Sequence, residues 1–330
     1  MAASRKALLA PPLLLIALGV IWSGYWFVGS HVTGTAIANW MSRESESGRR
    51  WTCHGQNISG YPFRFELSCS SVTLEDARAP VTVTAGPLRA VALAYRPNHV
   101  IAELDGPAQA ILPSGQKFTA NWTQLRMSTQ ISGGRLAAYD SVLEGFRAAQ
   151  VDASGEFQIA KAGSLETHLR QTPDVSPDAP SFDLAVDGKG VASALIDNLA
   201  GSNDPGDLTL RATLTRGDAI GPGNPIDIAE RWRLSGGKIT VAQLKIARGR
   251  IALDATGEFA LDDEHRVAGR VEGTAAGFEQ LLARGAGALG GLFNIRPSGG
   301  APKGLPFAVT LRDGRVMLGP LRIATLAPLY

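Results

Sequence analysis

The sequence predicts a mainly β protein that is carried on a single N-terminal membrane helix. Two observations lead to this fold class. The segment from Ala7 to Ser30 contains twenty-four residues without one charged side chain, and beyond Trp51 apolar residues recur at every second position. A helix of about 20 apolar residues spans a bilayer, and alternation with period two is typical of strands with one apolar and one polar face.

The N-terminal apolar segment is long enough to be a membrane anchor. Aromatic residues gather at its far end, where amphipathic rings prefer the level of the lipid headgroups; these are Trp22, Tyr25, Trp26 and Phe27. The alternative is a cleaved secretory signal, whose apolar region is shorter and is closely followed by a small-x-small site. The triplet Ala36-Ile37-Ala38 has that shape but lies well past the apolar run. We therefore predict an uncleaved transmembrane segment over Ala7 to Ser30.

The charges that flank this segment predict its orientation. Arg5, Lys6 and the amino terminus precede it, and the next charged residues are Arg43 and Glu44. Basic residues are retained in the cytoplasm, so residues 1–6 are predicted to form a cytoplasmic tail and the bulk of the chain is predicted to be exported. Further arginines shortly after Arg43 reduce this asymmetry.

Residues 31–50 are predicted to connect the anchor to the exported part. Val32, Ile37, Trp40 and Met41 recur at nearly helical spacing, and a polar stretch leads to Gly48. We expect the anchor helix to continue and to end before Gly48. A flexible stalk is the alternative.

The exported part is predicted to be an antiparallel sheet with few helices. One wet face on each strand favours antiparallel pairing, because buried parallel strands are apolar on both faces. The alternating segments are 81–85, 118–122, 165–169, 182–186, 208–214, 251–255, 267–271, 307–311 and 316–318. The candidate helices are 191–199, 226–234 and 275–292.

The two cysteines are predicted to form a disulfide. Cys53 and Cys69 lie sixteen residues apart on the exported side, where disulfides persist. A hairpin that turns near Gly60 would bring them opposite each other. Two free thiols are the alternative, and a zinc site is disfavoured because the five histidines are scattered.

Short sequence matches suggest an internal duplication. Residues 133–136 are matched by 236–239, and residues 152–157 are matched by 254–259, at offsets of 103 and 102 residues. Matches at one offset favour a true repeat, although strands built from few residue types also match by chance. The prediction divides the exported part into a first β half, 51–160, and a second β half, 161–330.

Composition and motifs argue against several classes of function. Basic and acidic residues are interleaved and the net charge is +2, so we expect no nucleic-acid partner. The chain contains no Walker sequence, no G-x-S-x-G and no H-E-x-x-H. The acidic run Asp262 to His265 lies between two strand patterns and is predicted to be a solvated hairpin turn. We therefore expect no enzyme, no catalytic or metal-binding residue and no cofactor.

One stretch between the cysteines resembles a known bacterial family, and further segments agree with it. The stretch consists of Gly60, Tyr61, Pro62, Phe63, Arg64 and Phe65, followed by Glu66 and Leu67. It resembles the uncharacterised family known as domain of unknown function 2125. Residues 86–89, 95–97, 236–262 and 269–282 fit the same pattern. The blocks 236–262 and 313–321 also resemble the wider AsmA-like class of envelope proteins.

The resemblance implies a fold and a place in the cell. It implies a bacterial inner-membrane protein whose exported, periplasmic part is an extended, curved antiparallel sheet. Such a sheet can form an apolar groove for lipid handling or envelope maintenance, so the expected partners are membrane lipid, including a groove-bound phospholipid, and an envelope protein. The alternative is a periplasmic interaction module with a closed β-sandwich core. The family pattern implies no catalytic residue.

Overall fold

The computed structural model describes residues 5–330 apart from residues 79, 174, 175, 177, 195, 196, 198–203, 221–223 and 278–303. Its helical elements are α1 (Arg5–Glu46), the short 3-10 helix η1 (Gly217–Ala219) and α3 (Pro225–Leu234). Twenty strands belong to a single sheet, and every pairing between them is antiparallel. The predicted mainly β fold with one long apolar N-terminal helix and one large antiparallel sheet is therefore confirmed.

The strands of the sheet vary widely in length. Their bounds are β1 (Arg49–His54), β2 (Asn57–Ser59), β3 (Arg64–Cys69), β4 (Ser71–Asp76), β5 (Val81–Ala85), β6 (Leu88–Leu93), β7 (Arg96–Leu104), β8 (Ala108–Ile111), β9 (Lys117–Asn121), β10 (Gln124–Ser132), β11 (Arg135–Asp152), β12 (Gly155–Gln171), β13 (Phe182–Ser193), β14 (Gly206–Leu214), β15 (Ile239–Arg248), β16 (Ile251–Leu261), β17 (Val267–Ala276), β18 (Leu305–Arg312), β19 (Arg315–Leu318) and β20 (Leu321–Thr325). The two longest, β11 and β12, pair with each other near the middle of the sheet.

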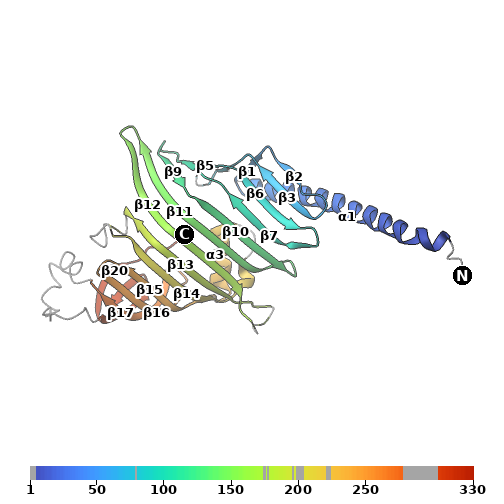
Figure 1. Ribbon diagram of the computed structural model, residues 1–330. Coiled ribbons are helices and arrows are strands. Elements are labelled where there is room, and N and C mark those ends of the chain that lie inside the picture. Colours follow the sequence, from blue (N-terminus) through green and yellow to red (C-terminus); the bar gives the residue numbers. More distant parts are fainter. Residues whose placement is uncertain are drawn as a thin grey trace.

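Helix α1 is one uninterrupted helix of 42 residues that projects from the sheet (Figure 1). It runs through the expected border between anchor and connector at residues 30 and 31. Its segment Pro11–Glu46 is long and apolar enough to cross a membrane. The helix ends before Gly48, whose φ of 84° suits a glycine and turns the chain into β1.

The sheet divides into two arms before β11. The first arm runs β2–β3–β6–β7–β10, and the second runs β1–β4–β5–β8–β9. Strand β10 pairs with residues 135–144 of β11, whereas β9 pairs with residues 147–151 of the same strand. From β12 onward a single sheet continues through neighbouring strands to β20.

A line of glycines crosses the sheet where the arms separate. Gly145 of β11 and Gly190 of β13 have φ values of 61° and 62°, and Gly163 of β12 lies between them. A Cβ atom on Gly145 would lie 2.8 Å from the hydroxyl oxygen of Thr123, and one on Gly190 would lie 3.5 Å from the backbone nitrogen of Gly163. Glycine accommodates both the left-handed backbone and the close approach, which allows the sheet to bend there.

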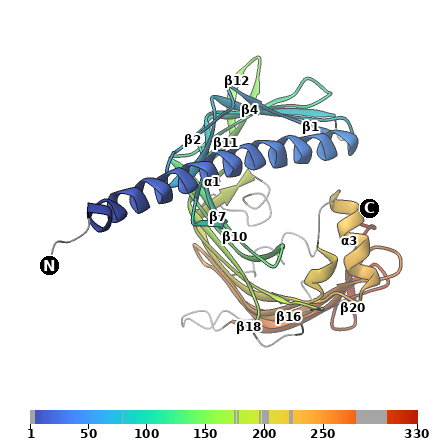
Figure 2. The ribbon, with the colours of Figure 1, turned by 90° about the vertical axis from the view of Figure 1, so that its right-hand side faces the viewer.

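The register places α1 and α3 against the same face of the sheet. Residues that are directly paired across neighbouring strands share a face. One such row is Phe65, Ala92, Val100, Thr129, Tyr139, Leu169, Leu184 and Ala212. Gly29 of α1 packs on the ring of Phe65, and Gly217 of η1 packs on the ring of Phe182, which is two residues before Leu184. Figure 2 shows the sheet as an arc with α3 on its inner side.

The buried side chains concentrate at the two ends of this face. Trp26, Phe65 and Ala94 form a cluster beneath α1. At the other end Phe182, Trp232 and Val241 are buried near η1 and α3. Helix α3 starts where Asn224 caps it by accepting a hydrogen bond from the nitrogen of Ile226, with Pro225 in the first turn.

The internal duplication and the apolar groove are not confirmed. Residues 152–157 comprise the end of β11, the turn and the start of β12, whereas their sequence match, 254–259, lies inside β16. The expected border between the β halves at residue 160 falls inside β12, and the sheet continues across it. Of the candidate helices, 226–234 lies in α3. In 191–199, residues 191–193 end β13, residues 194 and 197 are helical, and the others lie outside the described residues. In 275–292, residues 275–276 end β17, residue 277 is a bend, and 278–292 lie outside the described residues.

The disulfide joins the two arms. Cys53 of β1 is bonded to Cys69 of β3, with the Cα atoms 5.3 Å apart. The chain does turn near Gly60, but the hairpin pairs β3 with β2, and Cys53 lies opposite Val72 of β4. The cysteines are thus on strands that do not pair with each other, because a short strand, β2, intervenes in the sequence.

Candidate functional site

An apolar face extends across the single-sheet part of the molecule. We define the apolar face by three rows of residues that are in register on β12 to β18. The rows are Leu165, Leu208, Ile246, Leu253 and Leu305; Val186, Leu210, Leu244 and Phe307; and Leu169, Leu184, Val271 and Val309. Alternation along each strand produces this face, because every second side chain points to the same side.

The side chains of the apolar face are partly open to solvent. All of its residues are half-buried except Leu305, which is 41% exposed. Among the residues that the structure describes, no large side chain is fully buried. In a closed sandwich the side chains between the two sheets are packed as in a protein interior and are fully buried. The side chains of the apolar face are only half-buried, so the described strands do not form a sandwich core by themselves.

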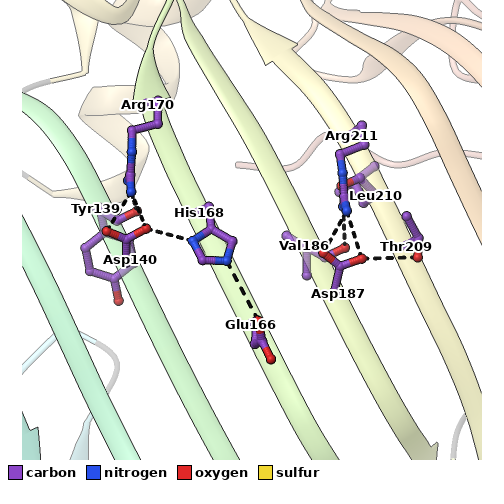
Figure 3. A network of polar contacts seen from close by, with 10 residues as sticks. All are labelled: Tyr139, Asp140, Glu166, His168, Arg170, Val186, Asp187, Thr209, Leu210 and Arg211. Atoms are coloured by element: carbon purple, nitrogen blue, oxygen red, sulfur yellow. Dashed lines mark hydrogen bonds and ion pairs between the residues drawn. The ribbon is translucent and has the colours of Figure 1, made fainter.

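The opposite face of the same strands carries charged side chains (Figure 3). Asp140 of β11 accepts hydrogen bonds from Arg170, at 2.7 and 2.9 Å, and from His168 Nδ1, at 2.7 Å. Burial raises the pKa of Asp140, but the hydrogen bonds from Arg170 and His168 outweigh it, and the pKa lies below its usual value. These groups hold β11 to β12.

A second ion pair follows on the next two strands. Asp187 of β13 accepts two hydrogen bonds from Arg211 of β14, at 3.0 and 2.8 Å, and one from Thr209, at 3.2 Å. The Arg211 guanidinium lowers the pKa of Asp187. Partly exposed pairs of this kind contribute about 0.2–1 kcal/mol each, so we interpret them as cross-strand contacts on a solvated face.

These polar groups do not assemble into a catalytic relay. Ser128 lies 2.8 Å from His99, but the Asp140 carboxylate bonds to a different histidine, His168. A serine relay requires one histidine between the hydroxyl and the carboxylate. In the described part of the chain no group of three His, Cys, Asp or Glu side chains is placed to hold a metal ion.

The motif that was identified in the sequence lies against α1. Trp22 Nε1 donates to the carbonyl oxygen of Pro62 at 2.9 Å, and Trp26 Nε1 donates to that of Arg64 at 2.8 Å. The hydroxyls of Ser23 and Tyr61 lie 2.8 Å apart. These bonds attach one face of the helix to the turn between β2 and β3.

Packing reinforces this attachment. Trp26 stacks on Phe65 with ring centroids 5.9 Å apart, and only 6% of Trp26 is exposed. Further along the helix Trp40 packs against Trp51 of β1, and Glu44 forms an ion pair with Arg49 at 2.7 Å. Helix α1 therefore contacts both arms of the sheet, as the disulfide does.

Sequence reasoning did not foresee this role of the helix aromatics. Their position at the end of an apolar run favours an environment of lipid headgroups, whereas the indoles of Trp22 and Trp26 point to the sheet. The sequence signal for this contact was the run Gly60 to Phe65, because its aromatic residues need a surface to pack against.

The turn from Asp262 to His265 is tied to α3 and the C-terminus. It connects β16 and β17, and Arg233 of α3 bonds to Asp263 at 2.9 Å. Glu230 accepts hydrogen bonds from Arg233 and from the hydroxyl of Tyr330. Hydrogen bonds from Arg233 and then Tyr330 lower the pKa of Glu230 to about 2. The arrangement fixes the end of the chain beside α3.

Comparison with known proteins gives one match. The model of the family described as an uncharacterized protein conserved in bacteria, DUF2125, matches residues 26–327. The chain belongs to this family. The DUF2125 match begins at Trp26, the residue that is buried against the motif. Neither the curated proteins nor the solved structures give a match.

Proposed function

We propose that this DUF2125 protein is a membrane-anchored envelope protein, without enzymatic activity, whose apolar face binds the acyl chains of phospholipids. In this proposal α1 spans the bacterial inner membrane once with its N-terminus in the cytoplasm. The sheet then lies on the periplasmic side, where it serves lipid handling or envelope maintenance. An envelope protein that receives the lipid is the expected further partner.

The observation that carries the proposal is the half-buried apolar face on a curved sheet. It extends over seven neighbouring strands, β12 to β18. An apolar surface of that extent requires a cover, and large exposed patches mark sites for protein, membrane or ligand. Lipid is the favoured ligand because the apolar face consists, apart from Phe307, of leucine, isoleucine and valine, and because it lies on the same side of the sheet as the candidate membrane helix α1.

Two further observations favour this proposal over a closed sandwich. All twenty described strands belong to one sheet, whereas a sandwich needs two sheets packed face to face. In addition, α1 packs on Phe65 of β3, outside the apolar face, and η1 packs on Phe182 of β13, while the leucine and valine rows stay half-buried among the described residues. The region between the helices is the predicted lipid site.

A photoactivatable phospholipid tests the proposal in membranes that contain the full-length protein. The variant L184D places a carboxylate on the apolar face, so we expect it to lose most of the lipid crosslinking of the wild type. The matched control, A185D, places the same charge on the opposite face of the same strand, opposite His168 and Arg211. Equal crosslinking in the two variants, with both folded by circular dichroism, would contradict the proposal.

A further inference from the structure

Exposed aromatic side chains gather at the tip of the first arm, around α1. The tip consists of the turn between β2 and β3 and the turn between β6 and β7. The exposed residues are Tyr61 at 54%, Phe63 at 65%, Leu93 at 40% and Tyr95 at 68%, with Phe27 of α1 at 63%. Large aromatic side chains are expensive to leave in water, so this group needs a partner surface.

Hydrogen bonds fix both turns at one height on the helix. The first turn is bonded to Trp22, Ser23 and Trp26, as described above. The second turn is held by Tyr25, whose hydroxyl donates to the carbonyl oxygen of Ala94 at 2.6 Å. Phe27 stacks on Tyr61 with centroids 5.9 Å apart. The tip therefore cannot change its depth independently of residues 22–27 of α1.

The apolar length of α1 places that height at a membrane surface. Lys6 is the last charge before the uncharged run, and Trp26 lies nineteen residues beyond Ala7. At 1.5 Å per residue this is about 29 Å along the helix, which matches a hydrocarbon core of about 30 Å. With Lys6 among the cytoplasmic headgroups, residues 22–27 lie at the opposite boundary of the core.

We infer that the tip of the first arm is seated in the membrane interface, in the leaflet on the exported side. Phe63 and Tyr95 enter the boundary between acyl chains and headgroups, and the exposed side chains of Arg64 and Arg96 lie at the level of the lipid phosphates. Aromatic rings and arginines are the side chains that favour this zone. The inference depends on the proposed membrane-spanning role of α1.

The consequence for the proposed function is a direct path for lipid. Phe65 at the tip shares a face with Leu169 and Leu184 through the paired row across the sheet. The side of the sheet that carries the apolar face therefore reaches the leaflet through the first arm. The class of ligand that this geometry supplies is a phospholipid of that leaflet.

Spin labels in the full-length protein test the depth of the tip. Both cysteines of the chain are in the disulfide, so F63C and Y95C each introduce one reactive thiol. The matched control is S154C, in the exposed turn between β11 and β12. Each labelled protein is placed in vesicles of phosphatidylethanolamine and phosphatidylglycerol, and collision with oxygen and with a water-soluble nickel complex is measured.

We expect labels at positions 63 and 95 to collide more with oxygen than with nickel, and the label at 154 to show the reverse. Greater collision with nickel at 63 and 95 would overturn the inference. Exclusion of both reagents there would show a protein contact in place of lipid and would also overturn it. Extraction of the same vesicles with alkaline carbonate tests the anchor separately. A protein that stays in the vesicles but whose labels at 63 and 95 collide mainly with nickel contradicts only this inference. A protein that carbonate releases from the vesicles contradicts both the anchor and the inference.

Discussion

At the scale of single residues, a buried tryptophan connects helix α1 to the sheet. The indole of Trp26 stacks on Phe65 and donates to the carbonyl oxygen of Arg64. Its neighbour in the sequence, Phe27, is 63% exposed. Two adjacent aromatics of α1 thus have different environments, one in protein and one on the outer surface of the helix.

This difference predicts the effect of two alanine substitutions. W26A removes a buried ring and its hydrogen bond, and Trp→Ala changes in cores cost about 3–5 kcal/mol. F27A removes an exposed ring, so its effect on thermal unfolding in detergent micelles should be much smaller. Unfolding temperatures that fall equally in both variants would show that Trp26 does not hold α1 to the sheet.

The contact between Glu230 and Tyr330 predicts a response to acid. The pKa of Glu230 is lowered to about 2 in the folded protein from 4.5. A lowered pKa means that the contact contributes fully above pH 4.5 and is lost as the pH falls toward 2. We expect the amide of Leu329, which donates to the carbonyl oxygen of His265, to lose protection from hydrogen exchange over that range, after correction for intrinsic exchange.

The control for this prediction is E230Q, which keeps the shape of the side chain and removes its charge. In E230Q the amide of Leu329 should be less protected from hydrogen exchange than in the wild type at neutral pH. Its protection should not change between pH 4.5 and pH 2. If the hydrogen-exchange protection of the Leu329 amide in the wild type is constant over the same pH range, the proposed role of Glu230 is wrong.

At the scale of elements, the two arms are held together by α1 and by the disulfide. Cys53 belongs to β1 and Cys69 to β3, and these strands pair with different neighbours. The bond therefore links elements that the backbone hydrogen bonds of the sheet leave unlinked. Covalent closure of a loop of this length stabilises a fold by roughly 3 kcal/mol in the chain-entropy model.

The disulfide gives a prediction for export and stability. If the arms are exported as proposed, neither cysteine of the wild-type protein should react with a maleimide until a reductant is added, because the exported side is oxidising. C53A/C69A should unfold at a lower concentration of guanidinium chloride, and its arm residues 47–70 should be cut more rapidly by protease. A thiol that reacts in intact cells without reductant would contradict the exported position of the arms.

Much of the element content could be predicted from the sequence, and much of the pairing could not. The alternation in Leu208–Leu214 and the periodic residues of 226–234 correspond to β14 and α3, because burial of one face leaves a direct periodic signal. The separation of β1 from β3 leaves no such signal, since it depends on which strands meet in space. The docking of Trp22 and Trp26 was hidden for a related reason: an aromatic ring suits both lipid and protein.

At the scale of the whole molecule, the alternation of side chains along the strands places apolar residues on one face of the sheet and charged residues on the other. The register places the aliphatic residues of the apolar face on the inner side of the arc that Figure 2 shows. The outer side carries ion pairs such as that of Asp187 with Arg211 (Figure 3). The curvature of the arc, with the glycine line at Gly145 to Gly190, directs the apolar residues inward. In our proposal, the tip of the first arm in the membrane interface and the apolar face on the same side of the sheet together provide a surface along which a lipid leaves the bilayer.

The most direct test of this account is a scan with a photoreactive amino acid along β14 in living cells, from position 208 to position 213. The measurement is the amount of phospholipid crosslinked at each position of the full-length protein. The account predicts lipid at 208 and 210 and little at 209, 211 and 213, because alternate residues face opposite sides of the sheet. Crosslinks without this alternation, or crosslinks to protein alone at 208 and 210, would contradict a lipid-binding apolar face.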